Sequence, residues 1–134
     1  MSKARIAIIV IFAAACLIRF ADAFRPINQA SWRECDIGSI ARNFAVEGMN
    51  PLYPRIDWRG TGPGYTEMEF PLYPWLIALT YKAFGIHDVA GRLWSLAFTI
   101  GTLFFFFRLA RETLSEYASI GAFAFFAFNP LILQ

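Results

Sequence analysis

Charged side chains are scarce in this chain, and metal-ligating histidines and cysteines are scarcer still. Asp, Glu, Lys and Arg make up 16% of the 134 residues, whereas soluble domains average about 25%. The single histidine, His87, has no second ligand beside it, and the two cysteines lack a metal-binding spacing. We interpret His87 and Asp88 as turn residues. The net charge of +2 is too small to indicate a nucleic-acid partner.

Apolar and aromatic residues dominate instead, at 57% and 18% of the chain. This composition is typical of a membrane protein. The hydrocarbon core of a bilayer is about 30 Å thick and takes roughly 20 helical residues to cross. Three segments approach that length, namely residues 6–24, 89–107 and 117–134. The predicted fold class is therefore an all-α membrane protein. We expect about three transmembrane helices, with interfacial helices in a large external loop between spans one and two.

The end of the first span leaves an alternative open. Arg19 and Asp22 lie three residues apart, so they share a helical face, where we expect them to pair or to extend toward the headgroups. Residues 21–23 also resemble the small-residue cleavage site of a signal peptide. The charge of Arg19, late in the apolar region, argues against cleavage. The third span stays uncharged to Gln134, and we expect the natural protein to continue beyond it.

Residues 70–84 are apolar but too short to cross a bilayer, because they would extend only about 22 Å as a helix. Pro71 and Pro74 fit only around a helix start. We therefore predict an interfacial helix. Its residues at headgroup level are expected to be Tyr73, Trp75 and Tyr81.

This interpretation sets the topology. If residues 70–84 do not span, Arg108 and Arg111 fall in a short cytoplasmic hairpin, as the positive-inside rule favours. The N-terminus is then inside and the loop of residues 25–88 is outside. That loop also holds basic residues, which the rule disfavours. Acidic residues balance them, however, and the rule is weak for loops beyond about 60 residues.

The loop contains one amphipathic helix, expected near residues 32–47. Ser31 and Glu34 form a capping-box pattern, apolar residues then recur at helical spacing, and Gly48 ends the run. The polar residues of the other face are expected to line an aqueous cleft: Asp36, Ser39, Asn43 and Glu47. A simpler explanation for Asp36 is that a carboxylate is stabilised near a helix N-terminus. Residues 51–65 follow as a loop with turn signals at Gly60 to Gly64.

Several motifs occur in an order that resembles the start of a GT-C glycosyltransferase. After the first span and an acidic residue on an external helix comes the pattern Y-x-x-x-E-x-P-L-Y-x-W-L-x-A-L-x-x-K-x-F-G. The resemblance is to the group that holds protein O-mannosyltransferases and lipid A aminoarabinose transferases. Residues 90–112 are similar to the family's second span, and Asn129 to Leu131 to the end of its third. The matching loop residues are Asp36, Tyr65, Glu69, Pro71 to Tyr73, Trp75 to Leu79, Lys82, Phe84 and Gly85.

The resemblance implies that residues 1–134 are the N-terminal portion of a transmembrane glycosyltransferase domain. The implied reaction transfers a sugar from a polyprenyl-phosphate donor to a lipid, protein or glycan acceptor. It would occur on the extracytoplasmic side of the inner or plasma membrane. Since a hydroxyl is a poor nucleophile, a carboxylate must take its proton, and Asp36 matches that catalytic base. The departing lipid phosphate needs cations or hydrogen-bond donors. The implied substrate-binding residues are Glu69, Glu67, Tyr65, Arg55, Arg59, Lys82 and Arg92.

The chain departs from the family pattern in two places. Ile37 follows Asp36 where the family often has Glu, and Phe70 follows Glu69 where it often has Lys. The phosphate contact is therefore expected from elsewhere. The sequence requires no cofactor, and a divalent metal, if used, would take Asp36 and Glu69. The alternative is a non-enzymatic multi-pass membrane protein, such as a transporter or a lipid-binding subunit. The acids gather in the external loop rather than within the spans, which favours surface chemistry.

Overall fold

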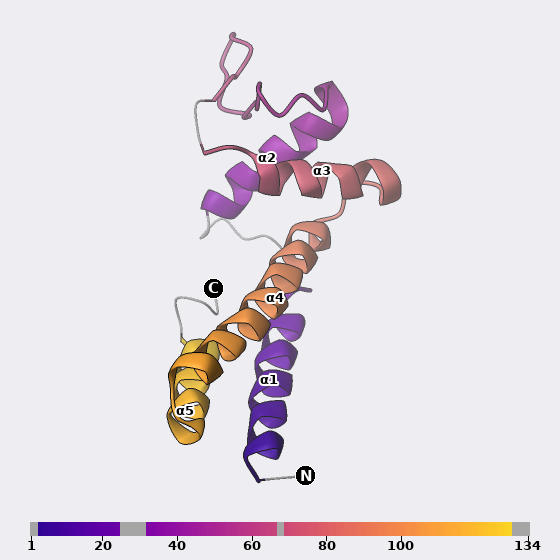
Figure 1. The fold of residues 1–134 in the computed structure, drawn as a ribbon. Coiled ribbons are helices and arrows are strands. Elements are labelled where there is room, and N and C mark those ends of the chain that lie inside the picture. Colours follow the sequence, from indigo (N-terminus) through magenta and orange to yellow (C-terminus); the bar gives the residue numbers. More distant parts are fainter. Residues whose placement is uncertain (1–2, 25–31, 67–68, 130–134) are drawn as a thin grey trace. The chain divides into compact units, whose positions relative to one another are not determined.

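The computed structural model describes residues 3–24, 32–66 and 69–129. Within these ranges the chain is helical, and its only β-pairing is an isolated antiparallel bridge between Arg55 and Tyr65. The predicted all-helical class is confirmed (Figure 1). The helices are α1 (Lys3–Asp22), α2 (Trp32–Glu47), α3 (Leu72–Phe84), α4 (Val89–Thr113) and α5 (Glu116–Ala127).

Two of these helices are long and apolar enough to cross a membrane. They are Lys3–Ala21 within α1 and the whole of α4. The third predicted span corresponds to α5, whose 12 residues would extend only about 18 Å. Residues 130–134 of that span lie outside the described part of the chain. The structure therefore supports two membrane-length helices and leaves the third span a prediction.

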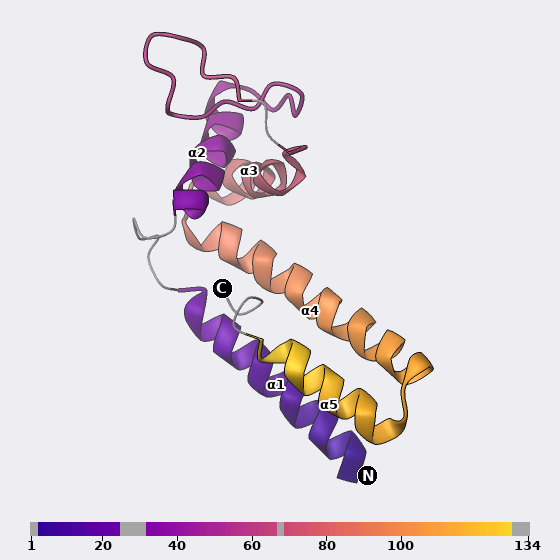
Figure 2. The same cartoon turned by 90° about the vertical axis from the view of Figure 1, so that its left-hand side faces the viewer.

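The chain divides into two compact units, the first made of Met1–Phe24 with Ser95–Gln134 and the second of Arg25–Trp94. In the first unit, α4 and α5 run antiparallel to each other, and α5 lies along α1 (Figure 2). Their common core contains Leu103 and Phe123, with the small side chains of Ala15 and Ala127. Phe106 and Phe126 stack with ring centroids 4.1 Å apart, which joins α4 to α5.

Arg19 is buried in the first unit, at 8% exposure. Its guanidinium donates hydrogen bonds of 3.1 Å to the carbonyl oxygens of Ala15 and Ala127. The bond to Ala127 satisfies a carbonyl at the C-terminal end of α5, where a cation is favoured. The side chain of Asp22, the predicted partner of Arg19, lies outside the described residues.

In the second unit α2 packs on α3. One cluster joins Ala41 of α2 to Ile77 and Tyr81 of α3, and a second joins Ile40 and Phe44 to Ala78. The alanines let the two helices approach closely. Tyr81 is only 6% exposed, so the prediction that it lies at headgroup level is wrong: its ring fills the core between the helices.

The predicted bounds of α2 and the predicted end of α3 agree with the structure, whereas α4 continues past the predicted end at residue 107 to Thr113 and α5 ends at Ala127. Pro71 immediately precedes α3 and Pro74 lies in its first turn, where proline does not interrupt a backbone hydrogen bond. Helix α2 ends at Glu47, and Gly48 follows with a φ of 146°, a conformation that favours glycine. Ser31, the predicted N-terminal cap of α2, lies outside the described residues.

Candidate functional site

Asp36 lies just beyond the first turn of α2 and is 8% exposed. Its backbone carbonyl accepts a 2.9 Å hydrogen bond from Ser39 Oγ. Within the described ranges its carboxylate forms no side-chain hydrogen bond or ion pair.

Two of the four polar residues predicted to share one face of α2 are buried, whereas Glu47 is exposed. Asn43, at 5% exposure, and Asp36 are buried beside Ile40 and Phe44. Asn43 Nδ2 donates to the Arg55 carbonyl oxygen at 3.0 Å, which ties the stripe to the loop that follows α2. Asp36 and Asn43 are therefore little exposed, and their place on an aqueous cleft stays a prediction.

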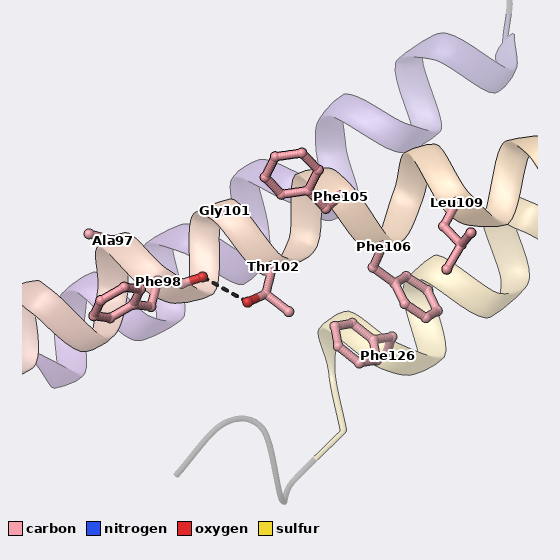
Figure 3. A pocket seen from close by; sticks show the side chains of 8 residues that line it. All are labelled: Ala97, Phe98, Gly101, Thr102, Phe105, Phe106, Leu109 and Phe126. Carbon is pink, nitrogen blue, oxygen red and sulfur yellow. Dashed lines mark hydrogen bonds between the residues drawn. The ribbon is translucent and has the colours of Figure 1, made fainter. Parts of the chain in front are cut away.

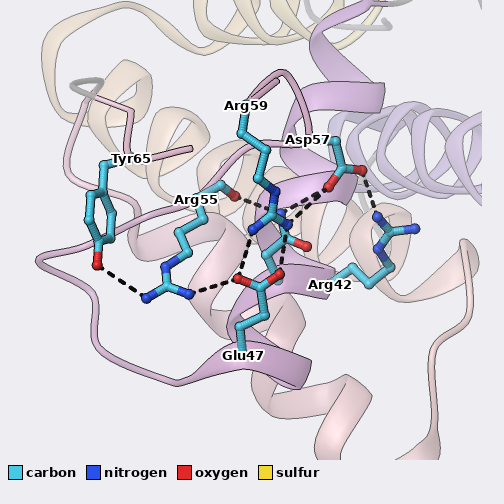
Figure 4. Close-up of polar contacts among 7 residues, drawn as sticks. Arg42, Glu47, Arg55, Asp57, Arg59 and Tyr65 are labelled. Carbon is cyan, nitrogen blue, oxygen red and sulfur yellow. Dashed lines mark hydrogen bonds and ion pairs between the residues drawn. The ribbon is translucent and has the colours of Figure 1, made fainter. Parts of the chain in front are cut away.

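Glu47 organises a charge cluster at the C-terminal end of α2 (Figure 4). Arg59 donates to both of its carboxylate oxygens, at 2.6 and 3.0 Å, and Arg55 donates to one at 2.9 Å. Arg55 also donates to Tyr65 Oη at 3.1 Å. The hydrogen bonds from Arg59 and then Arg55 lower the pKa of Glu47 to about 2. Three of the predicted substrate-binding residues, Arg55, Arg59 and Tyr65, are thus brought together. They gather around Glu47, a carboxylate of the protein itself.

A second ion pair completes the cluster. Asp57 accepts a 2.6 Å hydrogen bond from Arg42 and a 3.0 Å bond from Asn43 Nδ2. Sequence reasoning missed Asp57 and Arg42, which are separated along the chain and match no motif. The one available signal was that Arg42 and Asn43 are polar residues in an otherwise apolar stretch of α2.

The loop itself is built as a tight hairpin-like turn. Ile56 N–H donates to the Gly64 carbonyl at 2.9 Å, and Thr66 N–H to the Pro54 carbonyl at 3.0 Å. Gly64 has a φ of +73°, and a Cβ there would lie 2.7 Å from Arg59 Cβ. Glycine is therefore required at this position. The turn predicted at Gly60 to Gly64 is confirmed, with Gly60 also at positive φ.

The remaining predicted site residues lie apart from this cluster. Arg92, at the start of α4, pairs at 3.3 Å with Glu34 in the first turn of α2. Glu69 is strongly exposed and lies 3.6 Å from Arg33. Lys82 is exposed on α3, and Glu67 lies outside the described residues. Across the described ranges, no group of three or more His, Cys, Asp or Glu side chains is placed to hold a metal ion.

An apolar groove of 540 Å³ opens on the first unit, between α4 and α5 (Figure 3). Its lining residues are Ala97, Phe98, Gly101, Thr102, Phe105, Phe106, Leu109 and Phe126. Thr102 Oγ1 donates to the Phe98 carbonyl at 2.8 Å, so its hydroxyl is satisfied within α4. No side chain of this lining can ionise, which suits the groove to apolar chains rather than to chemistry.

Comparisons with protein-family models, with curated proteins and with solved structures found no match to this chain. Two features bear on chemistry. One is Asp36, a buried residue of α2, and the other is the ion pair between Glu34 of α2 and Arg92 of α4.

Proposed function

We propose that this chain is the N-terminal portion of a GT-C glycosyltransferase. It transfers a sugar from a polyprenyl-phosphate donor to an acceptor hydroxyl at the outer face of the membrane. The observation that supports the proposal is the position of Asp36, a little-exposed acid on α2 that matches the family's catalytic base. The ordered motifs around it supply the reaction class.

The helix-end explanation for Asp36 is weak. The acid in the first turn of α2 is Glu34, and it is paired with Arg92. Asp36 follows it, beyond the turn within which the helix dipole acts. A buried carboxylate in that position gains little from the dipole, and a substrate that hydrogen-bonds to it would offset its burial.

As general base, Asp36 would accept the proton of the acceptor hydroxyl while its oxygen attacks the anomeric carbon. The bond between that carbon and the donor phosphate oxygen breaks, and the polyprenyl phosphate leaves with the electron pair. Such a base typically contributes ~10²–10⁴-fold in rate. The leaving phosphate carries negative charge, so a cation near Asp36 is also needed.

Arg92 is the favoured phosphate-binding residue among those predicted. Arg55 and Arg59 both hydrogen-bond to Glu47, so both guanidiniums are already engaged within the chain. Arg92 contacts the helix that bears Asp36, through its 3.3 Å ion pair with Glu34. Exposed Lys82 is a second cation for the donor, and exposed Glu69 is proposed to shape the acceptor side.

The proposed topology has three spans in the inner or plasma membrane. They are α1, α4 and a third that contains α5, with residues 25–88 on the extracytoplasmic side. Two membrane-length helices support it. Lys3 and Arg5 at the start of α1, and Arg108 and Arg111 near the end of α4, support a shared cytoplasmic side.

Asp36→Asn tests the catalytic role in the protein expressed at its full natural length. The substitution is nearly isosteric but removes the proton acceptor. We expect transfer from a polyprenyl-phosphate sugar to fall by ~10²–10⁴-fold, with membrane insertion unchanged.

Asp88→Asn is the matched control, because Asp88 is an exposed aspartate of the same unit. It should keep near-normal transfer. Near-normal transfer by Asp36→Asn would make Asp36 a structural residue. An unmodified protein inactive with every polyprenyl-linked sugar would favour the non-enzymatic alternative.

A further inference from the structure

Trp58 lies at the apex of a tight turn in the second unit. The Arg59 N–H donates to the Asp57 carbonyl oxygen at 2.8 Å, which closes a three-residue γ-turn centred on Trp58. No described residue other than glycine has a positive φ, so the turn is of the inverse type. The central side chain of such a turn projects away from the closed backbone, and Trp58 is 80% exposed.

The residues on both sides of this apex are tied to α2 (Figure 4). Asp57 accepts a 2.6 Å hydrogen bond from Arg42. Arg59 donates to both carboxylate oxygens of Glu47, at 3.0 and 2.6 Å. Because the backbone is fixed on either side, the indole is presented in an ordered position. Such order before binding lowers the entropy cost of capturing a ligand.

Polar groups beside the indole are available to a ligand. The side chains of Arg42 and Asp57 are 50% and 41% exposed. Each carboxylate oxygen of Asp57 accepts one hydrogen bond from an α2 side chain, and such an oxygen has room for a second. Arg42 uses one terminal nitrogen for Asp57 and has further N–H donors. The indole of Trp58 adds an N–H donor of its own.

This combination has the chemistry that recognises a sugar. A sugar ring has a face of C–H groups that stacks on an aromatic plane, and its hydroxyls both donate and accept hydrogen bonds. A stable protein interface buries about 800 Å² on each partner, far more than one indole offers. A nucleic acid or an anionic lipid surface would favour an excess of cations, whereas Asp57 and Glu47 balance Arg42 and Arg59 here.

We propose that Trp58, Asp57 and Arg42 form a saccharide-binding subsite of the second unit. The indole stacks on the sugar ring, the carboxylate of Asp57 accepts hydrogen bonds from its hydroxyls, and the guanidinium of Arg42 donates to them. The subsite goes beyond the proposed transfer reaction, because it binds sugar without a catalytic group. It lies on the loop of residues 51–66 and on α2, and it does not depend on the role of Asp36.

Fluorine NMR tests the subsite in the whole chain, reconstituted in nanodiscs with fluorotryptophan in place of tryptophan. The signals of Trp58 and Trp32 are assigned from their loss in Trp58→Phe and Trp32→Phe. Maltotetraose, cellotetraose and chitotetraose are then titrated, and at least one should shift the Trp58 signal in a saturable manner. Trp32 is the matched control, because it is 70% exposed on α2, and its signal should not shift.

Two further variants separate the contributions, with binding followed by saturation transfer to the sugar protons. Trp58→Ala should abolish binding. Arg42→Gln removes the charged donor while Asn43 still holds Asp57. Hydrogen bonds to charged groups contribute enough that this variant should weaken binding about tenfold or more.

The proposal is overturned if none of the three sugars gives a saturable shift of the Trp58 signal, or if Trp32 shifts equally. Broadening of the Trp58 signal by a lipid with a spin-labelled headgroup would overturn it too, because the indole would then contact the membrane surface. Asp36→Asn should bind the sugars as the unmodified protein does. Failure of the proposed transfer reaction is therefore distinguishable from failure of this subsite.

Discussion

Glu47 is the ion-pair partner of two arginines that the sequence predicted to bind substrate. Arg55 and Arg59 match what a phosphate needs in charge, but the structure directs both onto Glu47. Isolated surface ion pairs contribute little to stability. Here two guanidiniums bind the carboxylate of Glu47, one of them in a bidentate manner. Such a network contributes more to stability than an isolated pair does. The role that follows is to hold the loop of residues 51–66 against α2.

This role predicts an acid-dependent loosening of the loop. The folded-state pKa of Glu47 is about 2, below its ordinary value of 4.5. The stabilisation is therefore fully present above pH 4.5 and is lost as the pH falls toward 2. A spin label at Thr61→Cys, at the exposed turn, should keep constant mobility down to about pH 5 and become more mobile below it.

Glu47→Gln provides the matching control, since an amide cannot titrate and pairs less strongly with guanidinium. It should mobilise the Thr61 label at all pH values and abolish the acid transition. An identical acid transition in Glu47→Gln would mean that another group controls the loop.

At the scale of elements, the contact between α1 and α5 depends on Arg19. The first unit joins these helices mainly through small and aromatic side chains. Arg19 adds a directed bond from α1 to the end of α5. In a low-polarity environment a side chain that satisfies a terminal carbonyl also removes the need for water at that end.

Arg19→Met should therefore loosen the last turn of α5. The substitution keeps an unbranched side chain but removes the donor to Ala127 O. Intramembrane hydrogen bonds contribute ~0.6–1.7 kcal/mol, so amide exchange near residues 124–128 should rise roughly 3- to 20-fold in nanodiscs. Arg108→Met removes the same charge from an exposed position of α4 and should leave this exchange unchanged. Equal amide exchange in the unmodified protein, Arg19→Met and Arg108→Met would show that packing alone holds the last turn of α5.

At the scale of the whole molecule, the two units correspond to an apolar part of the sequence and a part that is richer in charged residues. The first contains both membrane-length stretches apart from the opening residues of α4, and the second contains the loop with its acids and arginines. The connections between them run through α4 and through the segment that follows α1. The division therefore fits a membrane-embedded unit and an extramembrane one.

The topology predicts opposite accessibility for the two units. On a background without native cysteines, Trp58→Cys in the second unit should react with an impermeant thiol reagent in intact cells. Trp58 is 80% exposed. Arg111→Cys, near the turn between α4 and α5, should react only after the membrane is opened. Labelling of position 111 but not of position 58 in intact cells would invert the proposed orientation.

The sequence by itself determined the helical class, the approximate bounds of α1 and α2, the start of α4, and the prolines at the start of α3. These are local properties, because apolar length, glycine stops and proline geometry act over a few residues. Spacing also indicated that Asp36 and Asn43 share one stripe of α2. A periodic pattern shows which side chains lie together, but not what covers them.

Only the tertiary structure decided the state of the site. It buried Asp36 without a side-chain partner in the described ranges, paired Arg55 and Arg59 with Glu47, and placed Tyr81 in the core. Each outcome depends on segments distant in sequence, since Glu47 and Arg59 meet only when the loop folds back on α2. Electrostatic partners are chosen by distance in space, and the loop path that sets those distances results from the packing of the whole unit.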